Sequence, residues 1–126
     1  MKDEEKKITI LAYLAAYNHF DIDGMIKLLH ADIIFKNIAG GEINAQTNGM
    51  QEFRSLAEQS KGFFSSRQQQ ASNFQFQHDS ASVDISYEGV AVDLSNGLKT
   101  GETLKLEGRS ELTVKDDLLI AISDYS

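Results

Sequence analysis

The spacing of the apolar residues changes once along this chain, and that change restricts the folds that the chain can form. Up to the stretch SKGFFSS, apolar residues recur mostly every three or four positions, as on a helix with one buried face. After it, apolar and polar residues alternate, which is the two-residue period of a strand with one covered face. Helices followed by strands that are joined through short turns predict an α+β domain with an antiparallel sheet.

Three helices and a short strand are expected before the change of period. Acidic residues near the start of the first helix favour it, because they complement the partial positive charge of a helix N-terminus. Asp21 is a suitable N-cap for the second helix, and Asn48 with Gln51 three residues later resembles a capping box for the third. The expected elements are helices at 3–18, 22–30 and 49–60 and a strand at 32–37.

The second half of the chain consists of alternating runs separated by turn residues. In the first run, Phe74, Phe76 and His78 share one face, and the last run ends in LLIAISDYS. Polar residues and glycines between the runs mark the places where the strands reverse direction. Four local features are expected here: an exposed polar stretch at 67–70, a turn within 94–102, a bulge at Gly89 and strong curvature at Gly108.

Composition argues against several classes of function for what we expect to be a single domain, 1–126. The formal net charge of −7 opposes binding to nucleic acid or to an anionic membrane, because both require a basic surface. No apolar run is long enough to cross a membrane, and the start MKDEEKKITI lacks the features of a signal peptide, so a cytoplasmic location is expected. There is no cysteine, and no histidine is paired with a carboxylate at helical spacing, so neither a metal nor another cofactor is expected.

Several stretches of the chain resemble the nuclear transport factor 2-like superfamily, whose enzymes include ketosteroid isomerase and the SnoaL-type polyketide cyclases. The stretches are AYLAAYNHFDIDGMIKLLHADIIF, NGMQEFRSLAE and IAISDY, and the resemblance extends over essentially the whole chain. It implies a cone-shaped, curved antiparallel sheet wrapped around three N-terminal helices, with an apolar pocket at the open end. It also implies that the outer face of the sheet forms a homodimer.

Compared with ketosteroid isomerase, this chain keeps one of three catalytic groups. Tyr13 falls on the tyrosine of the oxyanion hole, whereas Asn37 falls on the position of the carboxylate base. An amide does not accept a proton near neutral pH, so it cannot replace that base. The second oxyanion donor of the isomerase falls on Ser110. Ketosteroid isomerase activity itself is therefore not expected.

The resemblance implies a pocket with an apolar wall and a few polar anchors. Each anchor also has a structural alternative: Tyr13 as a core phenol, and Asn37 as a strand-end residue that hydrogen-bonds its own backbone. Tyr17 is expected to be structural, packed against the second helix. The residues expected on the pocket wall are Tyr13, Phe35, Asn37, Phe53, Phe74, Phe76, Tyr87 and Ser110.

Three functions remain open at this point. The first is binding of a small apolar or carbonyl-containing molecule, without an assigned activity. The second is an enzyme of the isomerase, cyclase or dehydratase type, in which His78 or Asp124 acts as general acid/base. The third is a non-catalytic module that forms a homodimer through the outer sheet face. The charged residues expected on that face are Glu88, Glu107, Arg109 and Glu111.

Overall fold

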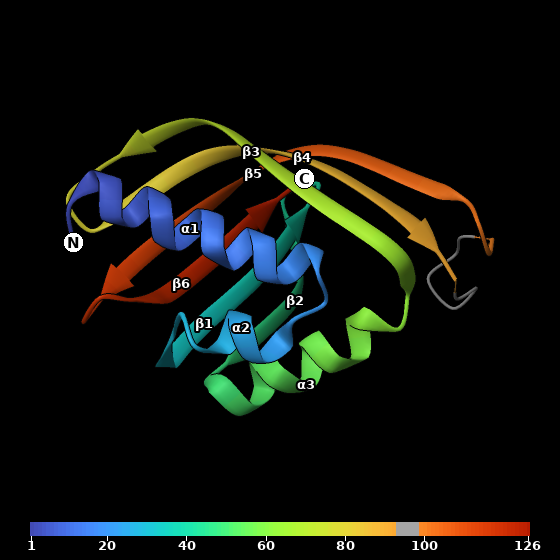
Figure 1. The fold of residues 1–126 in the computed structure, drawn as a ribbon, viewed down its shortest axis with the longest axis horizontal. Helices are drawn as coiled ribbons and strands as arrows, with labels where there is room; N and C mark the ends of the chain where they lie inside the picture. Colours follow the sequence, from blue (N-terminus) through green and yellow to red (C-terminus); the bar gives the residue numbers. More distant parts are fainter. Residues whose placement is uncertain (93–98) are drawn as a thin grey trace.

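The computed structural model describes residues 1–92 and 99–126, which contain three helices and six strands (Figure 1). Most of the turn expected within 94–102 lies outside the described residues. In chain order the elements are α1 (Asp3–Asn18), α2 (Ile22–Ile26), β1 (Leu29–Ala39), β2 (Glu42–Asn48), α3 (Met50–Lys61), β3 (Phe64–Phe76), β4 (Ser80–Ala91), β5 (Thr103–Lys115) and β6 (Leu118–Tyr125).

All six strands belong to one curved sheet, in the order β2-β1-β6-β5-β4-β3. Neighbouring strands run antiparallel, except that β1 and β6 are parallel. Figure 1 shows β3, β4 and β5 curving over α1, while α2 and α3 lie near the end formed by β1 and β2. The predicted class, an α+β domain with a cone-shaped sheet around three helices, is confirmed.

The first two helices follow their local sequence signals, but only α1 has the predicted length. α1 has the predicted bounds, and Ile10, Tyr13 and Leu14 form its buried side. Asp21 caps α2 as expected, because its carboxylate accepts a hydrogen bond from the Gly24 N–H at 2.9 Å. α2 ends four residues earlier than predicted, since the chain at Leu29 has already joined the sheet.

The segment that precedes α3 differs most from the prediction. The AGGE sequence is a hairpin turn, in which Gly40 and Gly41 have positive φ angles of 59° and 81°, and β2 follows it as an edge strand. The expected capping box of Asn48 with Gln51 is wrong, because the partner of Asn48 is Glu52. The backbone N–H of Asn48 donates to Glu52 Oε1 at 2.9 Å, and the N-cap of α3 is Gly49.

Two further expectations about the sheet need correction, and the strong curvature expected at Gly108 remains a prediction. The stretch 67–70 is not uniformly exposed, because Arg67 is buried. Pairing of β4 with β5 continues through Gly89, and the irregularity in β3, between Phe64 and Ser66, lies opposite Val90 and Ala91 rather than Gly89. A Cβ atom on Gly108 would lie 2.0 Å from the Tyr125 carbonyl oxygen, so this glycine permits the close approach of β6.

The core fills the part of the cone between α1 and the middle of the sheet. Its most deeply buried members are Ile10, Ile33, Val83, Leu112, Leu119 and Ile122. One end of this core is closed by Lys6, whose ammonium binds Asp3 and the Gln77 carbonyl and lies over the Phe76 ring. No helix among the described residues is long and apolar enough to cross a membrane.

Candidate functional site

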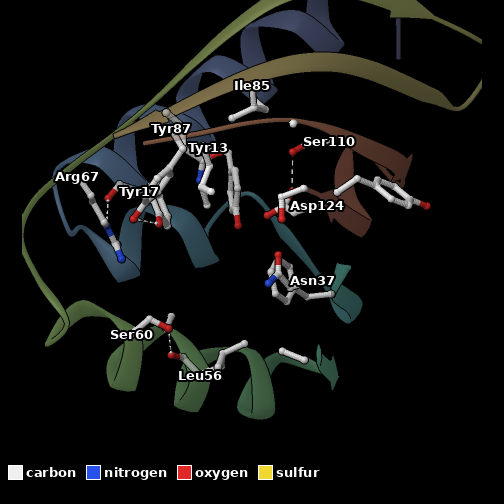
Figure 2. A pocket seen from close by; sticks show the side chains of 18 of the residues that line it. Tyr13, Tyr17, Asn37, Leu56, Ser60, Arg67, Ile85, Tyr87, Ser110 and Asp124 are labelled. Carbon is white, nitrogen blue, oxygen red and sulfur yellow. Dashed lines mark hydrogen bonds between the residues drawn. The ribbon is translucent and has the colours of Figure 1, made fainter. Parts of the chain in front are cut away.

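A cavity of about 350 Å³ lies between the helices and the concave side of the sheet (Figure 2). This volume is within the range of small-molecule sites, and most of the surface that faces the cavity is apolar. Phe35 and Phe53 form one wall, with their rings edge to face at a centroid distance of 5.8 Å. Of the residues predicted for the pocket wall, those that line the cavity are Tyr13, Phe35, Asn37, Phe53, Tyr87 and Ser110.

Three polar residues form a row across adjacent strands on this cavity wall. Asn37 of β1 is paired in register with Asp124 of β6, and Asp124 is paired with Ser110 of β5. Side chains at paired positions share one face of a sheet, so all three reach the same cavity. The sequence singled out each residue separately, but only the register of the folded sheet places them together.

Asp124 is the ionisable centre of this row. Burial raises the pKa of its carboxyl group from 3.8 to about 6, and the hydrogen bond from Ser110 partly opposes that rise. The Ser110 hydroxyl donates to Asp124 Oδ1 at 2.5 Å. No basic side chain in 1–92 or 99–126 forms an ion pair with Asp124. A carboxyl group with this pKa exchanges its proton readily near neutral pH, as a general acid/base must.

Tyr13 reaches the same cavity from α1, and it is only 5% exposed. Burial raises the pKa of its phenol well above the ordinary value, and the nearby charge of Asp124 raises it further. Within the described part of the chain, its hydroxyl has no hydrogen-bond partner. Tyr13 is therefore a neutral phenol that can donate its proton in a hydrogen bond to a ligand.

Asn37 contributes an amide whose orientation is set by the neighbouring strand. Its Nδ2 donates to Asn44 Oδ1 of β2 at 2.8 Å, so one of its N–H groups is already used. The side chain faces the cavity, as its register with Asp124 requires. The amide can supply a hydrogen bond here but no proton-accepting group.

A second polar group lies at the other side of the cavity. The hydroxyls of Tyr17 and Tyr87 are 3.3 Å apart, and burial is the main cause that raises the pKa of Tyr87. The guanidinium of Arg67 lies 3.7 Å from the ring centroid of Tyr17. Tyr17, expected to pack against the second helix, thus lines the cavity, and Arg67 was not identified because its neighbours in sequence are uniformly polar.

Phe74, Phe76 and His78 do not line the cavity. The two phenylalanine rings stack at 6.0 Å beside the core, and Lys6 and Lys7 lie over them. His78 follows the end of β3, its side chain is 97% exposed, and it lies 3.5 Å from Asp79. Entry of His78 into the cavity is therefore wrong, because the strand ends before the residue whose alternation placed it there.

The described residues contain no group of three or more histidine or acidic side chains that is placed to hold a metal ion.

A curved sheet wrapped around three helices is the fold of the nuclear transport factor 2-like superfamily. Residues 10–122 match the family model of the SnoaL-like domain. This chain belongs to the SnoaL-like domain family. Comparison with curated proteins finds no match.

Solved structures of similar fold come from several bacteria. One, from Xanthomonas campestris and provisionally described as a polyketide cyclase, has a TM-score of 0.83 and 20% identity, covering 98% of this chain and 90% of its own. An epoxide hydrolase of the LEH-like type from M. tuberculosis has a TM-score of 0.78 and 14% identity, covering 97% and 82%. A ketosteroid isomerase-like protein from Catenulispora acidiphila, in complex with trimethylamine, has a TM-score of 0.77 and 15% identity, covering 94% and 84%. At these identities the similarity establishes the fold.

Proposed function

We propose that this protein binds a small, largely apolar ketone in the cavity and transfers a proton on it, in a reaction of the isomerase or cyclase type. Asp124 is the general acid/base, and Tyr13 is the hydrogen-bond donor to the carbonyl oxygen. The observation that carries the proposal is a partly buried carboxyl group with a pKa of about 6 that shares the cavity with a phenol whose hydroxyl has no partner among the described residues. Perturbed carboxyl groups in apolar clefts are typical of catalytic sites.

The proton balance of the reaction is simple. The ionised Asp124 takes a proton from the carbon beside the ketone, and the electrons of that C–H bond move to the carbonyl oxygen to form an enolate. Tyr13 donates a hydrogen bond to this oxygen, and its neutral state at physiological pH makes the proton available. The protonated Asp124 then returns its proton to another carbon, or to the alkoxide that forms when the enolate carbon attacks a second carbonyl group.

This arrangement differs from that of ketosteroid isomerase in the position of the base. The two positions that carry carboxyl groups there fall on Asn37 and Ser110, and Asp124 lies between them in the same row of the sheet. A single carboxyl group on β6 is therefore flanked by two neutral hydrogen-bonding groups. The proposed base reaches the same cavity from β6, a neighbouring strand. We therefore expect its proton-transfer substrate to differ in shape from that of ketosteroid isomerase.

Enolisation can be measured without the natural ligand. In D₂O, proton NMR follows the exchange of the acidic C–H protons of 2-tetralone, a small apolar ketone, with and without the protein. The wild-type protein is expected to accelerate exchange above the buffer rate, and Asp124→Asn is expected to abolish that acceleration. Asp117→Asn, which changes an exposed carboxylate in the turn before β6, is the matched control and should exchange like the wild type.

Two results would contradict this function. One is exchange in Asp124→Asn at the wild-type rate, which would remove the assigned base. The other is an exchange rate equal to that of buffer for 2-tetralone, 1-indanone and cyclohexanone alike, which would remove the proposed reaction.

A further inference from the structure

Arg67 is a buried cation without an anionic partner among residues 1–92 and 99–126. Its side chain is 5% exposed, and no carboxylate of the described residues forms an ion pair with it. Burial of an unpaired charge is costly, so a buried arginine normally has a carboxylate or another anion beside it. The chain has an excess of seven negative charges, yet none of the described acids pairs with this arginine.

Part of the role of Arg67 is structural. Its Nε–H donates to the Tyr17 carbonyl oxygen at 2.9 Å, at the C-terminal end of α1, where the helix dipole favours a cation. The ring centroids of Tyr17 and Phe20 lie 3.7 Å and 4.4 Å from the Cζ atom of Arg67. These contacts position the guanidinium but use only one of its five N–H groups.

The other four N–H groups, on the two terminal nitrogens, have no hydrogen-bond partner in the described part of the chain. The guanidinium lines the cavity, together with the hydroxyls of Tyr17 and Tyr87. Those two hydroxyls share one hydrogen bond, which uses one of their two protons. A second phenolic proton is therefore available beside the guanidinium, and neither this proton nor the four free N–H groups has an acceptor among the described residues.

Figure 2 shows Arg67 at one side of the cavity and Asp124 at the other, with the three tyrosines between them. A ligand whose ketone lies near Tyr13 and Asp124 can extend along the aromatic wall toward Arg67. A carboxylate at that end would match the planar guanidinium, which binds two oxygens side by side.

From these contacts we infer that the ligand is an apolar oxo acid, whose carboxylate is bound by Arg67 and whose ketone faces Asp124. The inference rests on the proposed function for the position of the ketone, but the carboxylate site is tested by binding alone. It deepens that function by assigning a charge and a direction to the ligand.

The test compares two ligands of nearly equal shape, 2-naphthoate and 2-naphthamide, by isothermal titration at pH 7. Wild-type protein is expected to bind the carboxylate about tenfold to a hundredfold more tightly than the amide, because a hydrogen-bonded charge contributes that much at a buried site. Arg67→Gln should lose this preference. Arg54→Gln removes an exposed arginine of α3 that pairs with Asp23, and it should keep the preference.

Further measurements keep the inference open to refutation if Arg67→Gln does not fold. Arg67→Lys retains the positive charge but not the planar fork, so it is expected to retain only part of the preference. Wild-type protein that binds amide and acid equally, or that binds no acid from acetate to 2-naphthoate, overturns the inference. So does inorganic phosphate binding as tightly as 2-naphthoate, since the site would then recognise an anion without an apolar body.

The outcomes also separate this inference from the proposed function. A protein that exchanges the protons of 2-tetralone but does not prefer carboxylates overturns the Arg67 site alone. A protein that prefers carboxylates through Arg67 but exchanges no protons overturns the catalytic role of Asp124 and leaves the anion site supported.

Discussion

Replacement of Asp124 by asparagine should make the protein more stable at neutral pH. In the unfolded chain this carboxyl group loses its proton near its ordinary pKa of 3.8, whereas burial raises that pKa to about 6 in the folded chain. Between these values the unfolded chain binds fewer protons than the folded chain, so the free energy of unfolding falls as the pH rises. The two pKa values differ by about two pH units, and this corresponds to about 3 kcal/mol that is fully lost above about pH 6.

The Asp124→Asn variant has no ionisable group at position 124, so its free energy of unfolding does not fall in this way as the pH rises. Its amide replaces the carboxylate that accepts the hydrogen bond from Ser110, and imperfect replacement costs about 1 kcal/mol. We therefore expect the variant to be about 2 kcal/mol more stable than the wild type at pH 7.5, and about 0.5 kcal/mol less stable at pH 4, where the unfolded carboxyl group is already partly ionised. Urea unfolding followed by circular dichroism at both pH values measures the two differences.

The test is how much the stability difference between Asp124→Asn and the wild type changes from pH 4 to pH 7.5. Asp117→Asn, which removes an exposed carboxylate from the turn before β6, is measured as the control. A change smaller than about 1 kcal/mol for Asp124→Asn would mean that the carboxyl group is solvated and that its pKa is near the ordinary value. The acid/base assignment would then lose its physical basis.

Three further predictions concern the cavity and the sheet. Tyr13→Phe should slow the exchange of 2-tetralone protons roughly 100-fold, and should change the stability by less than about 1 kcal/mol, because its hydroxyl has no partner within the described residues. Gly108→Ala should destabilise the protein by about 3 kcal/mol in urea unfolding, because the added Cβ meets the Tyr125 carbonyl oxygen at 2.0 Å. Gly62→Ala, whose added Cβ has no neighbour nearer than 3.7 Å, is the control for it. A homodimer through the outer sheet face remains a prediction. Sedimentation at micromolar concentration tests it, and Glu107→Lys should weaken the dimer. A monomeric wild-type protein would refute it.

The elements that were predicted well are those determined by nearby residues. α1 has its expected bounds, because its buried face and its acidic first turn are both visible in sixteen consecutive residues. α2 was predicted too long because the pairing of Leu29 with Leu119, ninety positions later, draws the chain into the sheet. β2 was missed because only Thr47 of its residues is buried, so an edge strand leaves little alternation to detect.

The site was predicted in part, for a similar reason. Tyr13, Asn37 and Asp124 were each singled out by residue type and by resemblance, but their arrangement depends on the register between strands that are far apart in sequence. His78 was placed by extending an alternation beyond the end of β3. Arg67 was assigned to an exposed stretch because its burial results from α1 packing over β3, which the polar neighbours of Arg67 do not reveal.

The two cations that are buried among the described residues show how contacts separate a structural charge from a functional one. Lys6 binds the carboxylate of Asp3 and the carbonyl of Gln77, and its ammonium lies over Phe76, so its charge is compensated by groups of the protein at the closed end of the core. Arg67 is as deeply buried, but its partners in the described residues are one carbonyl and two rings, and its remaining donors face a cavity. Because burial costs both cations similar solvation, the one that the protein compensates less has more to gain from a ligand. The same reasoning applies to Asp124, whose carboxyl group is partly buried at the cavity and has one hydroxyl donor among the described residues. Among the described residues, the cavity therefore contains a cation without an anionic partner and an acid without a cationic partner, and a ligand that satisfies both must carry an anion at one end and a polar reacting group at the other.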